Sequence, residues 1–269
     1  MNPYIIDQHM HTNYSPDADP SATFKAYVKK AKSMGISKLM FTDHVDIDSV
    51  AALFNDLIDY DAYIKDLKQV EKEENFPLSL GVEIGYQPHL NERLNQFLDK
   101  YPFEFVVCSI HSGDGLDFYN GDFYRGKTQK EAYQRYFEIC LETVQNYDNF
   151  DVFGHLDYII RWGGYETRAY NYDDHKETIE AFLKVLIKKG KGLEINTSGI
   201  RYGLGMVHPS LDIMKAYKKL GGNIVTFGSD AHFVKDYYSG FDEVINLLKK
   251  AGFDEITVFE SRKPKFIKI

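Results

Sequence analysis

The sequence predicts an α/β fold whose parallel strands close into a barrel. Short apolar runs alternate with amphipathic stretches along the 269 residues, as expected for strands joined by helices in a parallel sheet. Histidine or carboxylate side chains follow nearly every expected strand, and the loops after the strands of a parallel barrel converge on one face. An open sheet would gather such residues at one switch point. Seven contributing loops therefore favour a ring.

The expected elements alternate along the chain. Strands are expected at seven apolar runs, residues 4–6, 38–42, 78–83, 105–110, 152–154, 192–196 and 223–228. The clearest helices are expected at 22–34, 129–147, 174–189, 210–220 and 243–251. Ser21 suits the N-cap of the first of these helices and Gly35 its C-terminal stop, as Gly190 and Gly221 do for later helices. Residues 256–259 are expected to add an edge or closing strand.

Size and composition fit one domain over residues 1–269. Barrels of roughly 250 residues commonly form one unit, and 19 Phe and 20 Tyr residues can fill a large core. The net charge is −8, from 32 Lys and Arg against 40 Asp and Glu. This balance argues against nucleic-acid and anionic-membrane partners, whose binding depends on basic patches. The oligomeric state is left open.

The two cysteines do not form a disulfide framework. Cys108 lies inside an apolar run, where a buried reduced thiol is expected, and Cys140 stands alone. No signal-like segment opens the chain, and the apolar runs are far shorter than the roughly 20 residues of a membrane span. We therefore expect a cytoplasmic protein.

Six of the nine histidines follow expected strands, which favours a shared metal site. Side chains alternate along a strand, so His9 and His11 point to the same side and can bind one ion. Imidazoles mixed with carboxylates suit zinc, manganese or iron better than magnesium or calcium. His89, His175 and His208 lie in polar or helix-flanking contexts and are expected to be structural. Single histidines follow four later strands: His44, His111, His155 and His232.

Three carboxylates accompany these histidines. Glu83 lies on an otherwise apolar strand, where bridging two cations would offset the cost of burying its charge; a buried ion pair with Arg or Lys is the alternative. Asp230 follows a buried-strand pattern two residues before His232. Asp17 lies beside Pro16, where Asp is common for local turn geometry, and Asp19 could take its place.

The order of these motifs resembles that of a known family. H-x-H at His9 and His11 is followed by T-D-H, G-x-E, S-x-H, G-H-x-D and S-D-A-H, spanning Asp7 to His232. Each motif alone is weak, but the six in this order resemble the polymerase-and-histidinol-phosphatase (PHP) family of metal-dependent phosphoesterases. Length and the sequences S-I-H-S and G-H-L-D are similar to those of its bacterial monofunctional histidinol-phosphate phosphatases.

The resemblance implies a distorted (β/α)7 barrel, similar to a TIM barrel. It also implies two or three divalent transition-metal ions (Zn, Mn, Fe or Co) at the C-terminal ends of the strands. Such ions would make the cleft of an acidic protein locally positive, and therefore suited to an anionic substrate. By motif position, the first ion would be held by His9, His11, Glu83 and Asp230.

The remaining ligands implied by the resemblance divide between two further ions. Many relatives have histidine where Asp17 stands, which puts that ligand in doubt. Glu83 would bridge the first ion to a second, completed by His111 and His155. The third ion would use His44, His232 and Asp17.

Two arginines are expected to bind the phosphate of a substrate. Arg161 follows the fifth strand and Arg201 the sixth, so both would lie at the barrel mouth, where a guanidinium matches phosphate oxygens bidentately. A surface role is the alternative for each. Asn196 could donate a hydrogen bond or orient a ligand, and Lys127 is a further candidate. Glu194 is expected to have only a structural role in the environment of its strand.

The resemblance implies hydrolysis of the small phosphorylated metabolite L-histidinol phosphate to L-histidinol and phosphate, in histidine biosynthesis. A water bridging two ions would ionise near neutral pH and attack phosphorus in line, while the third ion and the arginines stabilise the developing charge. Asp17, His232 or a metal-bound water would protonate the leaving alcohol. The catalytic set is thus Asp230, His232, Asp17 and Arg161.

The irregular stretch 113–128 is expected to cover the substrate. Its acidic and aromatic residues could receive the cationic end of histidinol phosphate; a solvated loop is the alternative. These residues are Asp114, Asp117, Tyr119, Asp122 and Tyr124.

Three other functions are weighed. A PHP-type phosphatase or phosphodiesterase acting on a nucleotide or nucleic-acid end would be expected to carry a basic stripe, which the chain lacks. An amidohydrolase shares the H-x-H start, but Glu83 and His44 fit that class poorly. A non-catalytic metal-binding regulator would have no reason to keep every ligand.

Overall fold

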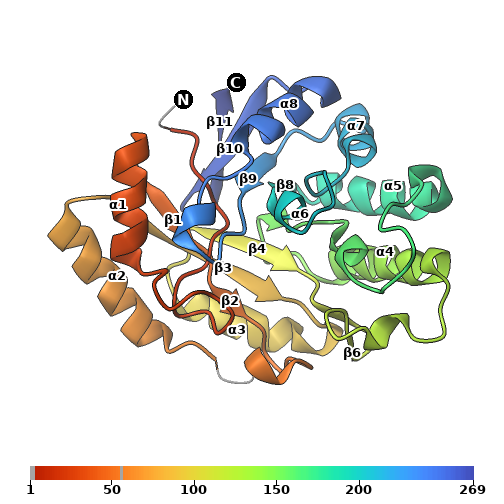
Figure 1. Cartoon of the computed structure of the whole chain (residues 1–269), viewed down its shortest axis with the longest axis horizontal. Coiled ribbons are helices and arrows are strands. Elements are labelled where there is room, and N and C mark those ends of the chain that lie inside the picture. Colours follow the sequence, from red (N-terminus) through yellow and green to blue (C-terminus); the bar gives the residue numbers. More distant parts are fainter. Residues whose placement is uncertain (1–3, 55–56) are drawn as a thin grey trace.

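The computed structural model describes residues 4–54 and 57–269, and its centre is a curled parallel sheet. Figure 1 shows the strands fanning through the middle of the molecule with helices outside them. The expected class, a distorted barrel of the α/β type, is confirmed. In spatial order the strands are β1 (Leu39–Phe41), β3 (Leu78–Gly85), β4 (Phe105–Ser109), β7 (Val152–Phe153), β8 (Gly192–Asn196) and β9 (Val225–Gly228), with β2 (His44–Val45) pairing with the end of β3.

Helices connect successive strands, as a parallel sheet requires. α2 (Tyr60–Glu74) and α3 (Asn91–Lys100) lie outside the set expected from the sequence. The buried stripe of α2 is half tyrosine, Tyr60 and Tyr63 with Leu67 and Val70, which weakens the apolar signal. The other helices are α1 (Phe24–Met34), α4 (Gln129–Asn146), α5 (Tyr172–Lys188), α6 (Ser198–Arg201), α7 (Leu211–Lys219) and α8 (Phe241–Ala251).

The N-cap expected at Ser21 is wrong by two residues. Thr23 caps α1, because its side chain accepts a hydrogen bond from the backbone N–H of Ala26. Ser21 instead donates its backbone N–H to the carboxylate of Asp19. Gly35 ends the helix as expected, with a φ of 71° that favours glycine.

The strand expected at residues 4–6 is not formed. Directly after this run, the buried carboxylate of Asp7 accepts the backbone N–H groups of Ser229 (2.9 Å), Tyr238 (3.0 Å) and His9 (3.3 Å). The N–H of Ser229 is thus not available to continue a ladder beside Gln8, and the segment runs beside β9 with only the isolated bridge between Met10 and Ala231.

The same segment nevertheless closes the gap between the two edges of the sheet. On one side, the carbonyl of Phe227 in β9 accepts the N–H of Gln8 at 2.9 Å. On the other side, the carbonyl of Met10 accepts the N–H of Thr42, just after β1, at 3.0 Å. An irregular chain thus stands where a regular barrel would have a strand, and it brings residues 9–11 to the carboxyl ends of β1 and β9.

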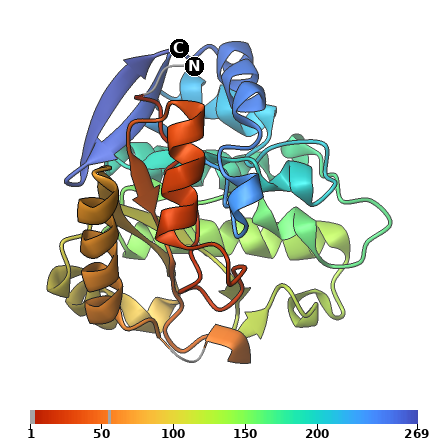
Figure 2. The same cartoon turned by 60° about the vertical axis from the view of Figure 1, so that its left-hand side comes forward.

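The run at 256–259 is a strand, but it does not join the main sheet as expected. It lies within β10 (Glu255–Glu260), which pairs antiparallel with β11 (Lys263–Lys268) as a separate hairpin. Figure 2 shows this hairpin as a long ribbon along one side of the molecule. The side chain of Gln8 ties it down by donating to the carbonyl of Thr257 and accepting the N–H of Phe259. No helix in the described ranges is long and apolar enough to cross a membrane.

Replacing Asp7 with alanine is expected to destabilise the fold by about 3 kcal/mol or more, because three backbone N–H groups lose a buried acceptor. The free energy of unfolding, measured by urea titration, tests this. Asp254→Ala is the matched control, since that carboxylate pairs only with lysine at the surface. An equal loss in both variants would contradict the role given to Asp7.

Candidate metal centre

The closing segment sets His9 and His11 beside Asp230. Asp230 donates its backbone N–H to the carbonyl of His9 at 2.7 Å, and His11 donates its own to the carbonyl of Ala231 at 2.9 Å. These bonds hold both histidine rings near one carboxylate oxygen: Asp230 Oδ1 lies 3.4 Å from His11 Nε2 and 3.9 Å from His9 Nε2. The H-x-H pair therefore faces one side, as its spacing predicts, although it is not on a strand.

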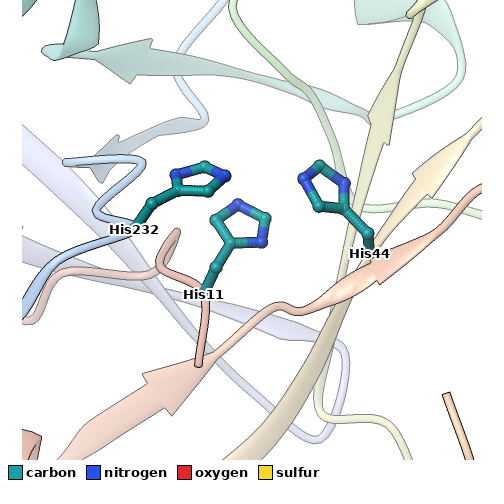
Figure 3. Close-up of side chains that lie close together, drawn as sticks. All are labelled: His11, His44 and His232. Atoms are coloured by element: carbon teal, nitrogen blue, oxygen red, sulfur yellow. The ribbon is translucent and has the colours of Figure 1, made fainter. Parts of the chain in front are cut away.

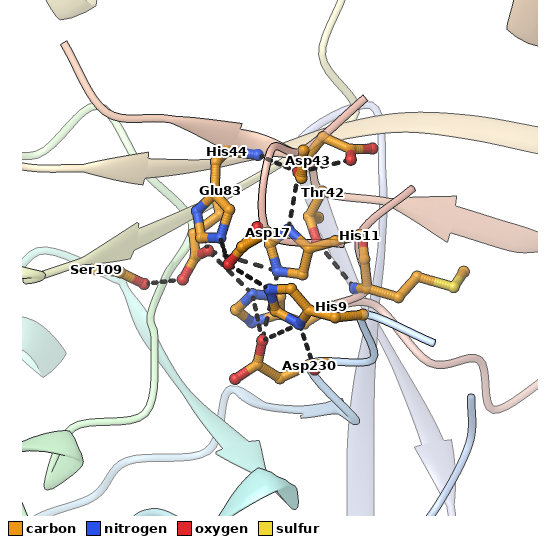
Figure 4. A network of polar contacts seen from close by, with 12 residues as sticks. His9, His11, Asp17, Thr42, Asp43, His44, Glu83, Ser109 and Asp230 are labelled. Atoms are coloured by element: carbon orange, nitrogen blue, oxygen red, sulfur yellow. Dashed lines mark hydrogen bonds and ion pairs between the residues drawn. The ribbon is translucent and has the colours of Figure 1, made fainter. Parts of the chain in front are cut away.

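Glu83 lies at the centre of the cluster and is 1% exposed. The parallel register of β3 places it opposite His44 of β2. Its Oε2 is 2.9 Å from His44 Nδ1 and 3.3 Å from His9 Nε2, and its Oε1 is 3.0 Å from His155 Nε2. His111 Nε2 lies 3.4 Å from Oε1. Figure 4 shows the carboxylate with rings around it.

The charge balance at Glu83 calls for a cation. Burial alone would favour the neutral acid, but His9, His44 and His111 hold the pKa of Glu83 well below its ordinary value. Burial also lowers the pKa of a histidine, yet Glu194 and Glu83 raise the pKa of His9 well above its ordinary value. Without another positive charge, protons on the rings must balance the carboxylates. A divalent ion would supply that charge and displace those protons.

Three histidines from distant parts of the chain form a further group within the cluster (Figure 3). The ring of His11 stacks on that of His44 at 4.2 Å and on that of His232 at 4.1 Å between centroids. Burial, followed by the neighbouring rings of His232 and His44, lowers the pKa of His11 to about 3. Asp17 lies at their open side, with Oδ2 3.0 Å from His232 Nε2 and 3.6 Å from His44 Nε2.

The donor set fits metal ions. Among the described residues, several buried atoms of this cluster have no hydrogen-bond partner, at a cost of about 1–3 kcal/mol each. Three groups of side chains each bring three ligand atoms within 4.8 Å of one another: His9–His11–Glu83, His44–Glu83–His111 and His11–His44–His232. Mixed imidazole and carboxylate ligands suit zinc and its neighbours. These buried atoms include Nε2 of His9, Nε2 of His11, Nδ1 of His44 and Oε2 of Glu83, which lie at ion-pair distances from one another without the geometry of a hydrogen bond.

Outer carboxylates orient the histidines, and the sequence analysis missed them. Glu194 Oε1 accepts the Nδ1–H of His9 at 2.5 Å, and Asp46 Oδ1 accepts that of His111 at 2.7 Å. Each bond leaves the Nε2 of the histidine as the electron-pair donor toward the cluster. Glu194 carried the same signal as Glu83, a carboxylate on an apolar strand, whereas nothing in the local sequence marks Asp46.

Two strand glycines give these carboxylates their space. A Cβ on Gly85 would lie 1.9 Å from Asp46 Oδ1, and a Cβ on Gly228 would lie 2.0 Å from Glu194 Oε1. Glycine is therefore required at these positions for close approach.

His11 reaches a carboxylate only indirectly. Its Nδ1 lies 3.3 Å from Ser15 Oγ, and Ser15 donates its hydroxyl to the buried Asp43 at 2.7 Å.

The four residues expected to bind substrate lie in different places. Arg161 and Arg201 line the cleft above the cluster, which has a volume of about 950 Å³. Arg201 donates to the backbone carbonyls of Ser229 (2.7 Å) and Asp230 (2.6 Å). Asn196 is fully buried behind the cleft and donates to Glu194 at 3.2 Å. Lys127 donates to the carbonyl of Phe123 and does not line the cleft.

The stretch 113–128 contributes only partly to the cleft. Asp117 and Tyr119 line it, and Tyr119 packs edge-on against Trp162 with centroids 4.9 Å apart. The other three candidates of this stretch are engaged locally: Asp114 pairs with Arg135, Asp122 with Arg125, and the hydroxyl of Tyr124 donates to a backbone carbonyl.

The curled sheet and its buried histidine cluster define the class of protein. Residues 7–198 match the PHP domain. Every histidine and carboxylate expected as a metal ligand within this range lies in or beside the cluster. The chain belongs to the PHP-domain family.

Relatives that match nearly the whole chain carry more specific names than the family does. The chain is 33% identical over 261 residues to the histidinol-phosphatase of Lactococcus lactis, covering 96% of this chain and 95% of that protein. A Clostridium acetobutylicum protein named "Probable histidinol-phosphatase" is 28% identical and covers 97% of this chain and 99% of its own length.

Solved structures of similar proteins have the same fold. The crystal structure of histidinol phosphate phosphatase from Lactococcus lactis, complexed with zinc, L-histidinol and phosphate, superposes with a TM-score of 0.86 at 30% identity, over 96% of this chain and 98% of that one. A structure from Listeria monocytogenes at 21% identity shares the fold, with a TM-score of 0.74 over 88% of this chain and 98% of its own.

Replacing Glu194 with glutamine is expected to weaken metal binding about 10–100-fold, because the charge that orients His9 is lost. Zinc titration of the chelator-treated protein measures this affinity. Glu177→Gln, on the exposed face of α5, is the control and should leave it unchanged. Unaltered zinc affinity in Glu194→Gln would show that His9 does not need this partner.

Proposed function

We propose that this protein is a histidinol-phosphatase, hydrolysing L-histidinol phosphate to L-histidinol and phosphate. One observation carries the proposal: six histidines and three carboxylates from separate parts of the chain meet beneath a single cleft. The full-length relatives named as histidinol-phosphatases support the substrate, and the Lactococcus lactis complex with L-histidinol and phosphate supports a small phosphorylated metabolite as the ligand.

We assign the metal ligands as the motif order implies. His9, His11, Glu83 and Asp230 would hold one ion, and Glu83 with His111 and His155 a second. The zinc in the Lactococcus lactis structure supports zinc as a resident metal. Bound divalent ions would activate a water for attack on phosphorus and neutralise charge on the phosphate. A third ion is supported by the convergence of His11, His44 and His232 beside Asp17.

The residues at the open side of the cluster have roles beyond ligation. Side chains of Asp17 and His232 are 29% and 22% exposed, whereas those of His9, His11 and Glu83 are at most 1% exposed. Asp17 and His232 therefore face a substrate in the cleft and, together with a water that the ions would hold, are the candidates for passing a proton to the leaving alcohol oxygen. Arg161 would bind the phosphoryl oxygens, and Arg201 would hold the Asp230 loop through its carbonyls.

Asp117 and Tyr119 are proposed to receive the cationic end of the substrate. Both line the cleft, and Trp162 and Tyr202 extend the aromatic wall, with centroids 5.4 Å apart. An imidazole or ammonium group is attracted to aromatic faces and to carboxylates. Asn196 and Lys127 have no part in this proposal because neither lines the cleft.

We also propose that residues 1–269 act as one domain. Support comes from β9 and the loop after it, which lie beyond residue 198, where the family match ends, yet supply Asp230 and His232 to the cluster. The cytoplasmic location expected from the sequence stays a prediction.

The zinc-reconstituted protein is expected to hydrolyse histidinol phosphate with a kcat/KM at least about tenfold above that for serine phosphate, since only the former has an imidazole for the aromatic wall. Chelator-treated protein is the blank. A nucleoside monophosphate and a phosphodiester in the same assay test the alternative activities. Equal values for histidinol phosphate and serine phosphate would remove the substrate assignment and leave the phosphatase; no turnover of any ester would remove both.

Glu83→Ala is expected to lower kcat at least about a thousandfold, because loss of the bridging carboxylate dismantles the cluster. Phosphate release by protein purified and assayed with excess zinc measures the effect. Glu177→Ala serves as the control. Near-normal turnover in a zinc-replete Glu83→Ala protein would refute the bridging role.

A further inference from the structure

Asp157 and His208 form a buried pair behind the cleft that the proposed chemistry does not use. Asp157 Oδ1 lies 2.5 Å from His208 Nδ1, and both side chains are 0% exposed. Asp157 ends the G-H-x-D motif, and His208 was expected from the sequence to be structural. Neither residue belongs to the groups that could hold a metal.

The Asp157 carboxylate is fixed on its far side. Its Oδ2 accepts the backbone N–H of Ser210 at 2.9 Å and the hydroxyl of Tyr170 at 3.0 Å. Two donors therefore occupy Oδ2. A carboxylate oxygen only accepts, so Oδ1 accepts the Nδ1–H of His208. The position of the carboxylate fixes the orientation of the imidazole.

The other nitrogen of His208 meets Arg161. Arg161 Nε lies 3.3 Å from His208 Nε2, and a guanidinium only donates, so Nε2 must carry the lone pair. Burial lowers the pKa of His208, which agrees with a neutral ring. The backbone of His208 is held by paired hydrogen bonds with Asn196, at 2.6 and 2.8 Å. Gly199 leaves room for the ring, since a Cβ there would lie 3.1 Å from His208 Nε2.

The guanidinium of Arg161 has contacts at both faces and at two of its three nitrogens. Its guanidinium lies between the rings of Tyr158 and Tyr202, 4.6 and 4.7 Å from their centroids. Nη2 donates to Ser198 Oγ and, at 3.4 Å, to Asp230 Oδ2. Within residues 4–54 and 57–269, Nη1 has no hydrogen-bond partner, and Arg161 lines the cleft.

We propose that Asp157 and His208 are positioning residues that hold Arg161 with its free Nη1 directed at the phosphoryl group of the substrate. Asp157 orients the imidazole, and the imidazole accepts from Nε and so fixes the guanidinium plane between its two aromatic neighbours. The proposal rests on the phosphatase function proposed above. It gives a role to the last residue of the G-H-x-D motif and to a histidine more than 50 positions later.

Two substitutions at one position separate the contacts of His208. In His208→Asn, the amide nitrogen replaces Nδ1 and keeps the donor to Asp157, but nothing accepts from Arg161. In His208→Gln, the longer amide can present an acceptor near the place of Nε2. His175→Asn is the matched control, because His175 is also a largely buried histidine that contacts a side chain (Gln134) through Nδ1.

The affinity of the zinc-loaded protein for inorganic phosphate, measured by calorimetry, and kcat/KM for histidinol phosphate are the two readouts. His208→Asn is expected to weaken both roughly tenfold or more, because a hydrogen bond to a charged group is lost. His208→Gln should recover part of the loss, and His175→Asn should match the wild type. Zinc content should be unchanged in all three variants.

A double-substitution cycle tests whether the effect passes through Arg161. In an Arg161→Lys background, His208→Asn should change phosphate affinity less than about twofold, since lysine has no Nε to hold. The proposal is overturned by a full loss in that background, by wild-type phosphate affinity in His208→Asn, or by loss of zinc. If the wild type binds phosphate with this dependence on His208 but hydrolyses no ester, the proposed function fails and the positioning role stands.

Discussion

The site depends on one buried carboxylate. Glu83 is 1% exposed, and its two oxygens lie within 3.6 Å of ring nitrogens on five histidines. A buried charge is tolerated only when it is paired, and neutral imidazoles present lone pairs rather than positive charge. The buried carboxylate is therefore stabilised only when cations lie between it and the rings. This requirement explains why the strands, the closing segment and the outer carboxylates all converge there.

The geometry of the sheet delivers the other partners to Glu83. β3 is fully buried and lies between β1 and β2 on one side and β4 on the other, so its carboxyl end is surrounded by the ends of neighbouring strands. The irregular segment at residues 8–11 completes the circle because its backbone bonds to both edges. The side chain of Asp7, just before this segment, also ties it to Ser229 and Tyr238, which flank the ligand loop after β9.

The sequence predicted the parallel sheet and the cluster because both have local signatures. Apolar runs mark β3 and β4, and His9, His11 and Glu83 stand out where polar residues follow or interrupt such runs. Two features that the sequence did not reveal have a common cause. The captured N–H groups around Asp7 and the contacts of Asp46 involve residues distant in sequence, which no local pattern records.

The candidates that lie outside the cleft are a separate case. Lys127 and Asn196 have suitable chemistry and follow the expected strands or loops, but local hydrogen bonds turn them away. The sequence could identify side chains able to donate a hydrogen bond to a substrate, but it could not show which of them already donate to other groups of the protein. His208 shows the reverse case, since a helix-flanking histidine beside a proline gave no sign of its contact with Arg161.

Gly85 and Gly228 set a limit on how far this fold can be stiffened. Exchanging glycine for alanine is a common route to thermal stability, because it reduces the freedom of the unfolded chain. Here the missing methyl groups are the space that Asp46 and Glu194 occupy. Thermostable variants, whether engineered or natural, should therefore gain rigidity in the helices and surface loops while these two strand positions stay bare.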